Sequence, residues 1–359
     1  MSSSSSNQFE LISILRKNRS AYPHEVAKVK LQESHISWVI LTGKYVYKIK
    51  KELKFGQILD FSTLALRKKF CQKEVDINKV LCGDMYKGVV KVIKQKRGQD
   101  KENRLRIVDL KSKGRALEYA VKMLEIPQKF RMDNLLQEGK INSHTIDELT
   151  STLVKFHNSA TTNSKIKSFG KPEFIKRKVD ENFATLSKLT NINNHKLERS
   201  LKSFIENKRN LLLQRVRDGK IRDIHGDLYL KNIFIVPGTK KFYLYDRIEF
   251  NDSLRYADVA EDVAHLAMDL DFHGRSDLRK YFISAYLLQS KDTHLEDIVY
   301  FLMCYKAYMR VKVSLFRAEG LDKTNSNDRV KMEQAEEEAR NHLELAESYL
   351  ELLKEDTYQ

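Results

Sequence analysis

The chain changes character after Pro127, and this change limits the folds that it can adopt. Upstream, apolar and polar residues alternate in short segments, and a period of two predicts half-buried strands. Two of these segments are joined by Thr42-Gly43-Lys44, which is a hairpin signal. A helix is predicted over residues 63–81, with Ser62 as its N-cap. The predicted strands are residues 26–32, 37–41, 45–51, 88–95 and 118–124.

Downstream, helical periodicity takes over in residues 144–158, in most of 174–218 and in nearly all of the chain from Asp258. The stretches IHGDLYLKNIFIV and KFYLYDRIEF interrupt these helices with short strands. This order predicts an α+β fold of two lobes: a small antiparallel-sheet N-lobe with one helix over residues 1–124, and a large, mainly helical C-lobe over residues 125–359. Ligands commonly bind between two such lobes.

The chain has 359 residues, of which 41% are hydrophobic and 32% are charged, enough for the cores of two moderate domains. Its start, MSSSSSNQFE, has no basic segment followed by an apolar run, so residues 1–8 are predicted to be a disordered tail and not a secretory signal. Residues 298–316 form the longest apolar stretch, but it contains three cations and therefore predicts a core helix instead of a membrane span. Three scattered cysteines without a C-x-x-C pair argue against a disulfide framework and a zinc site.

We therefore expect a cytoplasmic protein without a membrane partner; nothing in the sequence indicates its oligomeric state. The net charge of +16 favours phosphate-bearing ligands. Residues 87–115 contain eleven Lys or Arg and three acids, which indicates either a solvated hairpin or a surface for RNA or another polyanion. No aromatic side chains are interleaved with these cations, which weakens the case for stacking on single strands.

Asp227 and Asn232 lie in a polar loop between two apolar segments, in the spacing H-x-D-x-x-x-x-N that begins at His225. Protein kinases use this spacing in their catalytic loop, where the Asp orients or deprotonates the attacking hydroxyl and the Asn binds a metal ion. Asp246 follows the strand-like KFYLY, where the kinase pattern places its main Mg²⁺ ligand. Either motif alone could be a surface turn, but together they favour a phosphoryl-transfer site.

Lys48 lies in the middle of a predicted strand and shares a face with Val46. Glu74 borders the apolar stripe of the helix predicted over 63–81, and a partly buried carboxylate needs a partner. A Lys48–Glu74 pair, similar to the strand-lysine and helix-glutamate pair of kinases, meets this need. Lys50 shares the face of Lys48 and is the alternative cation. The predicted stripe consists of Leu66, Phe70, Ile77 and Leu81.

This constellation resembles the aminoglycoside phosphotransferase-like branch of the protein-kinase-like superfamily, whose members phosphorylate small molecules as well as antibiotics. The chain looks closest to uncharacterised bacterial and archaeal members. The resemblance extends from about residue 35 to 271 and implies a bilobal protein-kinase-like fold that transfers phosphate from ATP to an alcohol group with Mg²⁺. The stretches that carry it are HISWVILTGKYVYKIKK, LDFSTLALRKKFCQKEVDIN, EYAVKML, HGDLYLKNI and DRIEFNDSLRYADVAEDVAHLAMDL.

The resemblance also implies roles for single residues. Asp227 would be the catalytic base, Asn232 and Asp246 the Mg²⁺ ligands, and Lys48 the phosphate anchor with Glu74 as its partner. ATP is the expected nucleotide, although the sequence does not separate it from GTP.

The remaining implied roles concern the hinge and the loop. The hinge near Val121 to Met123 would contact the adenine, and His225 and Asp262 would brace the catalytic loop. Many relatives have His where this chain has Tyr229. Neither a G-x-G-x-x-G loop nor a Walker motif is present, so the ESHISW stretch would cover the phosphates with backbone amides and with Ser34 or His35.

The acidic strip from Asp258 to Asp269 has three interpretations: a solvated face, a metal site, or, as the resemblance favours, a brace in which Asp262 accepts amides of the catalytic loop. Arg310 is a weaker candidate for the substrate site, with pairing to a buried acid as the alternative. The residues directly after Asp246 are expected to lie near the acceptor and to contact it, unless they form an ordinary loop. They are Glu249, Asn251, Asp252 and Arg255.

Two classes of function follow. The first is a small-molecule kinase that phosphorylates a sugar, a polyol or an amino alcohol, with Asp227 as the base. The second is a kinase-fold module that binds RNA or another macromolecule through residues 87–115, and we favour it less because the set of predicted catalytic residues is complete. A protein Ser/Thr kinase lacks support, since no A-P-E segment follows Asp246.

Overall fold

The computed structural model describes residues 3–56, 58–95, 104–190, 194–236, 238–239, 241–319, 321 and 324–355. The chain forms two compact units. Unit 1 consists of Met1–Phe130, Phe234–Pro237 and Tyr243–Asp252, and unit 2 contains the remaining segments. The boundary that we placed after residue 124 differs from this division, because the first unit continues to Phe130 and takes in two later segments.

Unit 1 is built on a six-stranded sheet with the order β1-β2-β3-β8-β6-β7, in which all neighbours are antiparallel. The expected hairpin is confirmed, since β2 and β3 pair around Gly43, which has a φ of 87°. β1 starts later than expected and β7 was not predicted. The strands are β1 (Lys30–Glu33), β2 (Ser37–Leu41), β3 (Tyr45–Lys50), β6 (Tyr86–Lys94), β7 (Leu105–Asp109) and β8 (Ala116–Leu124).

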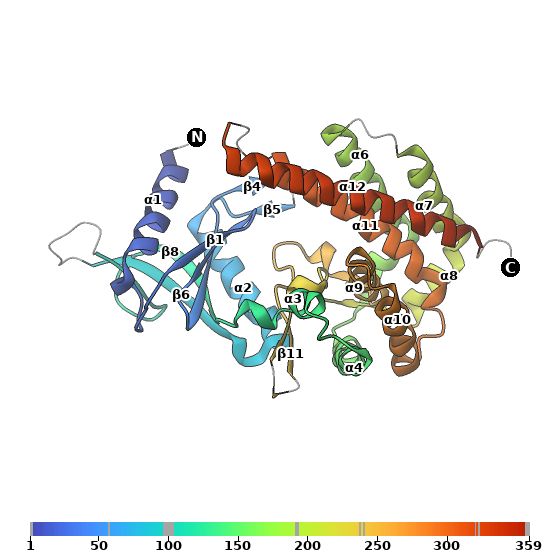
Figure 1. The fold of residues 1–359 in the computed structure, drawn as a ribbon, viewed down its shortest axis with the longest axis horizontal. Helices are drawn as coiled ribbons and strands as arrows, with labels where there is room; N and C mark the ends of the chain where they lie inside the picture. The colour runs from blue at the N-terminus through green and yellow to red at the C-terminus, as the bar shows by residue number, and fades with distance from the viewer. Residues whose placement is uncertain are drawn as a thin grey trace. The chain divides into compact units, whose positions relative to one another are not determined.

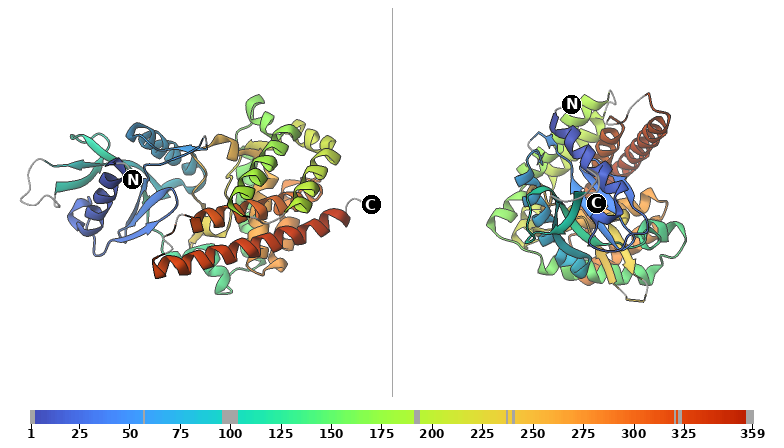
Figure 2. Two further views of the ribbon diagram at one scale, coloured as in Figure 1. Left: turned by 90° about the horizontal axis from the view of Figure 1, so that it is seen from above. Right: turned by 90° about the vertical axis from the view of Figure 1, so that its left-hand side faces the viewer.

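Two helices cover opposite faces of this sheet (Figures 1 and 2). α1 (Ser3–Lys17) packs on the face that carries Tyr47 and Ile49, and α2 (Leu64–Cys82) packs on the face that carries Val46. Because side chains alternate along a strand, Lys48 and Lys50 share the face of Val46 and point toward α2. The strand pattern therefore delivers both lysines to one helix.

The tail expected over residues 1–8 is wrong from Ser3 onward, where α1 begins. This segment is ordered because the Gln8 amide is buried against the sheet. Gln8 Nε2 donates to Lys50 O and to Glu118 Oε2, both at 2.9 Å, and Gln8 Oε1 accepts from Glu52 N at 2.9 Å. Glu118 of β8 also accepts from Arg67 of α2 at 3.0 Å, so one buried carboxylate binds both helices.

α2 also differs from expectation in its cap and its buried face. Thr63, not Ser62, caps the helix, because its hydroxyl accepts from Leu66 N at 3.2 Å. The apolar stripe that we predicted is half-buried. The fully buried positions instead include charged and polar groups, of which Arg67 and Glu74 form ion pairs with residues of the sheet. They are Arg67, Cys71, Glu74, Val75, Asn78 and Cys82.

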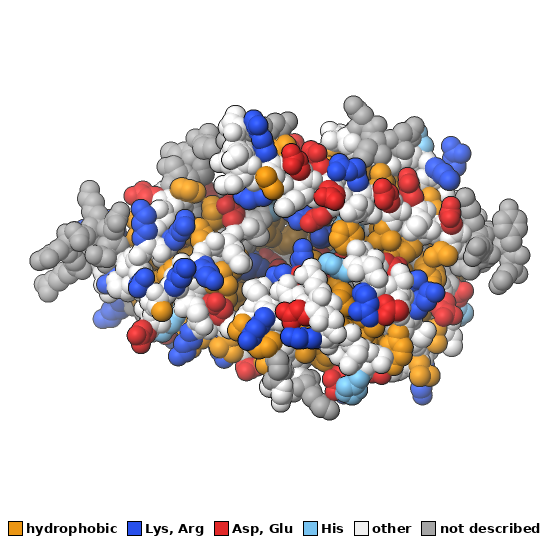
Figure 3. Space-filling view, in the orientation of Figure 1, with side chains coloured by type: hydrophobic (Ala, Val, Ile, Leu, Met, Phe, Trp, Pro, Cys, Tyr) orange, Lys and Arg blue, Asp and Glu red, His pale blue; other side chains and the backbone are white. Residues whose placement is uncertain are grey.

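The basic segment 87–115 forms the β6–β7 hairpin and the turn that follows it, and its residues 96–103 lie outside the described residues. Lys91 is buried, and its ammonium donates to Ser112 O at 2.7 Å and to Gly114 O at 3.0 Å. This lysine therefore stabilises a turn. In Figure 3, Lys and Arg side chains cover much of the visible face of unit 1, with a few Asp and Glu among them.

Unit 2 is mainly helical, as expected. A short antiparallel pair, β9 (Ile221–Asp223) and β12 (Tyr256–Asp258), flanks the segment with Asp227 and Asn232. The hairpin of β10 (Ile233–Val236) and β11 (Lys241–Leu244) follows along the chain and is divided between the two units. The helices are α3 (Met132–Gln137), α4 (Ser143–Ser159), α5 (Ser164–Lys167), α6 (Pro172–Leu189), α7 (His195–Asn207), α8 (Arg209–Arg217), α9 (Ala260–Phe272), α10 (Ser276–Ser290), α11 (Glu296–Glu319) and α12 (Ser326–Glu355).

α9 is the central helix of unit 2, and every residue from Ala260 to Leu270 is buried. Its first turn is fixed by Asp258, whose carboxylate accepts from Ala260 N at 2.9 Å and from Arg215 at 2.7 Å. α11 packs against α9 and α12, and α12 runs alongside α11 (Figure 2). The core helix predicted over 298–316 is confirmed as part of α11. None of the helices that the structure describes combines the length and the apolar character that crossing a bilayer requires.

Replacing Gln8 by Ala should lower the free energy of unfolding by about 1–3 kcal/mol, because it removes the hydrogen bonds of a buried amide to Lys50 O, Glu118 Oε2 and Glu52 N. The single tryptophan, Trp38, lies in the core beside α1, so its fluorescence during urea unfolding reports on unit 1. Asn7→Ala, on the exposed side of the same helix, is the control and should change stability by less than about 0.5 kcal/mol. Equal effects of the two substitutions would contradict this role of Gln8.

Candidate active site

Two lysines of β3 and one glutamate of α2 form the centre of the candidate site in unit 1. Lys48 Nζ lies 2.9 Å from Glu74 Oε1 and 2.5 Å from Asp246 Oδ1. Lys50 Nζ lies 2.7 Å from Glu74 Oε2 and also contacts Glu249. Glu74 thus offers one carboxylate oxygen to each lysine.

The two lysines differ in access. The Lys48 side chain keeps 12% of its exposure, whereas the Lys50 side chain has none and its ammonium lies 4.9 Å from the centre of the Phe61 ring. A ligand in solution can therefore reach Lys48 but not Lys50. This difference favours Lys48 over Lys50 as the cation that meets a nucleotide.

Burial and charge act against each other in this cluster. Burial favours the neutral form of Glu74, but the charges of Lys48 and Lys50 outweigh it and lower the pKa of Glu74 to about 2. Burial likewise opposes the charge of Lys48, yet Asp246 and Glu74 raise the pKa of Lys48 well above its ordinary value. For Glu249 burial prevails over the attraction of Lys50, and the pKa of this carboxyl is raised.

Asp246 is held by α2 on both sides along the chain. Asn78 Oδ1 accepts from Arg247 N at 2.9 Å, and Cys82 Sγ lies 3.1 Å from Leu244 O. Asp246 itself has a φ of 66°, in the left-handed region that residues other than Gly seldom adopt. Its side chain is 41% exposed, so the carboxylate is presented to solvent while the backbone is fixed.

The other residues predicted to bind the nucleotide are placed differently. Ser34 and His35 are exposed in the β1–β2 turn, and the Ser34 hydroxyl accepts from Ser37 N at 3.0 Å, which closes that turn. Val121 and Met123 lie inside β8, between β3 and β6, and their side chains are buried in the core beneath α2. β8 thus has a partner strand on each side at these two residues, and their contact with the adenine stays a prediction.

The four residues predicted to contact the acceptor differ in burial and in their partners. Glu249 is buried against Lys50, and Arg255 is buried 3.5 Å from Asp223, which makes both of them internal ion-pair partners. Asp252 remains partly exposed and lies 2.7 Å from Lys73, while Asn251 is half-buried. Chain proximity to Asp246 therefore did not identify surface residues in the case of Glu249 and Arg255.

In unit 2, Asp227 lies in the loop that follows β9, with 31% of its side chain exposed. Asn232, five residues later, donates from Nδ2 to Asp227 O at 2.9 Å and to Asp227 Oδ2 at 3.4 Å. The loop thus brings the two motif residues into contact, with the Asn amide nitrogen turned toward Asp227. The backbone N–H of Asp227 points at His225 Nδ1, 3.3 Å away.

Buried carboxylates of α9 hold the backbone of this loop. Asp262 accepts from His225 N at 2.8 Å, from Gly226 N at 2.9 Å and from His157 Nε2 at 3.1 Å. Asp269 accepts from Leu230 N at 2.8 Å. The solvated acidic face that we considered for this strip is therefore wrong for Asp269 and for Asp262, both of which are buried.

The charge of Asp262 and the glycine at position 226 are both consistent with this hydrogen bonding of the loop. Burial would raise the pKa of Asp262, but the hydrogen bond and charge of His157 prevail and lower it, so the carboxylate is ionised where it accepts the loop amides. Gly226 has a φ of 87°, and a Cβ there would lie 2.6 Å from Leu254 O. Glycine is therefore required at this position of the loop.

The ligands that Mg²⁺ prefers are carboxylate and carbonyl oxygens, with phosphates and waters completing the shell. Because Asn232 uses its nitrogen on Asp227, its Oδ1 is left as a ligand oxygen and accepts no hydrogen bond within the described part of the chain. Asp246 offers an exposed carboxylate in unit 1. Among the residues that the structure describes, no group of three His, Cys, Asp or Glu could hold a metal ion.

Three side chains near Asp227 were underrated by the sequence analysis. The Tyr229 and His265 rings stack with centres 5.6 Å apart and planes at 13°, and His265 Nδ1 lies 3.8 Å from Asp227 Oδ1. The Arg310 guanidinium lies 4.9 Å from the centre of the Tyr229 ring and forms no ion pair with an acid of the described residues. The expected pairing of Arg310 with a buried acid is thus not found. Periodicity placed His265 beside Asp262 but carried no sign of its neighbours on other elements.

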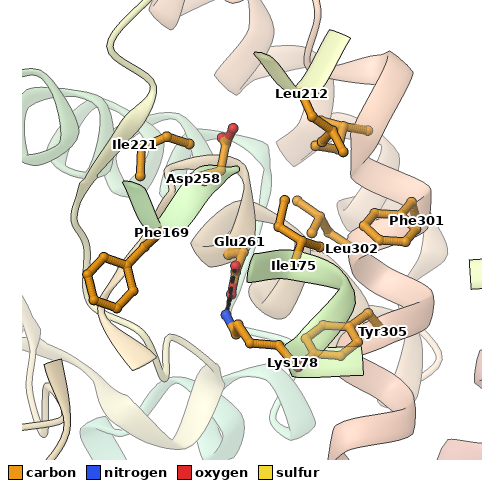
Figure 4. Close-up of a pocket in the computed structure, with 12 residues that line it drawn as sticks. Phe169, Ile175, Lys178, Leu212, Ile221, Asp258, Glu261, Phe301, Leu302 and Tyr305 are labelled. Carbon is orange, nitrogen blue, oxygen red and sulfur yellow. Dashed lines mark hydrogen bonds and ion pairs between the residues drawn. The ribbon is translucent and has the colours of Figure 1, made fainter. Parts of the chain in front are cut away.

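A cavity elsewhere in unit 2 is too small for a sugar-sized ligand. It is lined mainly by apolar side chains around the Glu261–Lys178 pair (Figure 4). Its volume of about 20 Å³ holds roughly one water molecule. Glu261 is also bound to Lys306 at 2.8 Å, which, with Lys178, lowers the pKa of Glu261 to about 2 against the effect of burial.

Two mycobacterial proteins are similar to this chain in sequence. They are the uncharacterized proteins Rv2004c of Mycobacterium tuberculosis (strain ATCC 25618 / H37Rv) and Mb2027c of Mycobacterium bovis (strain ATCC BAA-935 / AF2122/97), each 29% identical over 294 residues. The match covers 80% of this chain and 55% of each relative, so the chain spans about half the length of these proteins. No family model matches the sequence.

Among solved structures, a choline kinase from Cryptosporidium parvum Iowa II shares the fold. Its TM-score is 0.52 at 13% identity, and the match covers 98% of this chain and 97% of that one. The expected fold, an antiparallel-sheet part followed by a mainly helical part as in this kinase, is thereby confirmed. At this identity the likeness concerns the fold.

The Glu74 cluster should make unit 1 sensitive to acid. A pKa lowered from 4.5 to about 2 contributes stability above pH 4.5, and this stability is lost as the pH falls toward 2. The contribution amounts to about 3 kcal/mol. Urea unfolding followed by Trp38 fluorescence should show a shallower loss in this window for Glu74→Gln than for the wild type, with the exposed Glu10→Gln as control. Parallel pH profiles of wild type and Glu74→Gln would disprove the coupling.

Asp262→Asn should loosen the catalytic loop, because the charged acceptor of two amides is lost. Hydrogen exchange of the His225 and Gly226 amides is expected to accelerate by about one to two orders of magnitude, which corresponds to the loss of a hydrogen bond to a charged group. Glu336→Gln, an exposed neutralisation on α12, provides the control. Unchanged exchange at both amides would show that other contacts hold the loop.

Proposed function

We propose that the protein transfers the γ-phosphate of ATP to a hydroxyl of a small polar molecule, such as a sugar, a polyol or an amino alcohol. The observation that carries the proposal is the contact of Lys48 with both Glu74 and Asp246. These residues are 26 and 198 positions away from Lys48 in the sequence, yet both carboxylates lie within 3 Å of one ammonium. A kinase needs this set, because phosphate charge must be anchored and screened during transfer.

Asp227 is the proposed base. Its carboxylate is accessible and accepts hydrogen bonds, and it lies on a backbone that Asp262 and Asp269 hold through amides. A carboxylate in a fixed position can orient the acceptor hydroxyl and take its proton as the phosphate transfers. The backbone that positions Asp227 is thus held in place, while the carboxylate itself faces solvent.

Lys48 is proposed to bind the nucleotide phosphates, with Glu74 keeping its ammonium extended. Asn232 Oδ1 and the Asp246 carboxylate would hold Mg²⁺, which screens the charge on the phosphates when it is bound. The choline kinase with the same fold supports the reaction class; choline itself is not carried over to this chain. ATP as the donor and a cytoplasmic location remain predictions of the same proposal.

The alternative, a module that binds RNA through residues 87–115, gains no support from the described residues. Lys91 is used inside unit 1, and residues 96–103 lie outside the described part of the segment. A catalytic role also accounts for the exposed Asp227 carboxylate and the Asp246 conformation, which a binding module does not require.

Asp227→Asn should reduce phosphate transfer by about 10²–10⁴-fold, because the amide cannot take the proton. Nucleotide affinity should change little, since Asp227 is assigned to the acceptor. The measurement is ADP release with ATP and Mg²⁺ over a panel of sugars, polyols, amino sugars and nucleosides, combined with calorimetric ATP binding. Lys48→Met is the matched comparison and should weaken ATP binding instead. Loss of ATP binding in a folded Asp227→Asn protein would refute the assigned role.

A further inference from the structure

The surface beside Asp227 carries a cation whose donors are not used. Arg310 of α11 is half-buried, and its guanidinium lies over the Tyr229 ring. Neither a hydrogen bond nor an ion pair joins it to the residues that the structure describes. A guanidinium has five N–H donors in a planar fork that matches a carboxylate or a phosphate.

The acids around Arg310 are already engaged. Asp269 accepts from Leu230 N, and Glu338 of α12 contacts Arg317. Burial would lower the pKa of Arg310, but Tyr229, Asp227, Asp269 and Glu338 raise it, so the guanidinium stays charged. The nearby cations are Lys231 and Arg317, which act on the same carboxylates.

His265 gives a second, independent sign of a ligand. It is fully buried, and neither ring nitrogen has a hydrogen-bond partner. Burial, followed by the charges of Lys306 and Arg310, lowers the pKa of His265 well below its ordinary value, so the imidazole is neutral, with one donor and one acceptor. An unsatisfied buried imidazole 3.8 Å from Asp227 is costly unless a bound molecule completes it.

We propose that Arg310, Tyr229 and His265 form the acceptor subsite beside Asp227 and that they select an acceptor carrying a carboxylate or a phosphate, such as a sugar acid or a sugar phosphate. This inference rests on the proposed kinase function, in that it takes Asp227 to mark the acceptor. Arg310 pairs with the anionic group, the Tyr229 ring holds the guanidinium and the imidazole in place, and His265 bonds a hydroxyl next to the one that reacts.

The same geometry works against cationic acceptors. An ammonium bound by an aromatic ring needs the face of that ring, and a face of Tyr229 is already taken by the Arg310 cation. A second cation nearby would be repelled. Simple amino alcohols are thus disfavoured among the acceptors considered above.

Binding of matched pairs tests the subsite. The full chain, with ADP and Mg²⁺ present so that anions do not occupy the nucleotide site, is titrated calorimetrically at constant ionic strength. The probes are gluconate and glucose 6-phosphate against glucose, and glycerate against glycerol; the carboxylate and phosphate arms separate the two anionic groups. At least one anionic member should bind about tenfold or more tightly than its neutral parent, and Arg310→Gln should remove that difference.

Arg317→Gln removes an arginine of the same helix that already has Glu338 as its partner, and it should leave the affinities within about twofold. Equal affinity of anionic and neutral members, no binding of any anionic member, or full anion binding by Arg310→Gln would each overturn the subsite. Anion binding through Arg310 without ATP-dependent transfer would leave the subsite standing and refute the kinase. Transfer to neutral or amine acceptors with an unchanged KM in Arg310→Gln would support the kinase function and refute the subsite.

Discussion

The carboxylates of α9 hold the main chain of the loop that contains Asp227, and the geometry of unit 2 depends on this contact. Asp262 and Asp269 are buried in the centre of the unit and accept amides of a loop in which Asp227 keeps a partly exposed carboxylate. A buried carboxylate without such donors would cost several kcal/mol, so helix and loop depend on each other. The loop needs glycine at position 226, because a Cβ there would clash with a neighbouring backbone oxygen.

In unit 1, buried charges are stabilised by ion pairs instead of backbone amides. Two lysines of one strand face one helix, and a single carboxylate, Glu74, satisfies both of them. Lys50 and Glu249 complete the charge balance in the interior, which leaves Lys48 as the member that solvent can reach. The buried pair of Lys50 and Glu249 thus helps to fix Lys48. The two lysines have different surroundings because one is internal and the other is accessible to solvent.

Periodicity was sufficient to find the strands that carry Lys48, the helix that carries Glu74 and the helical character of unit 2. The motif spacing H-x-D-x-x-x-x-N, not periodicity, identified Asp227 and Asn232, whose contact is local. Periodicity failed for several charged or polar groups that are buried by a distant partner. They are Gln8 in a stretch expected to be disordered, Asp269 on a face for which solvation was one interpretation, and Glu249 and Arg255 in a segment expected to bind substrate. Such burial depends on pairings between elements, which hydrophobic patterns do not encode.

The backbone of Asp246 has a consequence for the residue type at this position. A left-handed conformation costs an aspartate roughly 1 kcal/mol relative to glycine, so this position trades folding stability for a carboxylate. Glycine there would relieve the backbone, but it would delete a proposed metal ligand and remove one of the two carboxylates that pair with Lys48. Backbone energy alone therefore favours glycine at this site, and the ion pair with Lys48 opposes it.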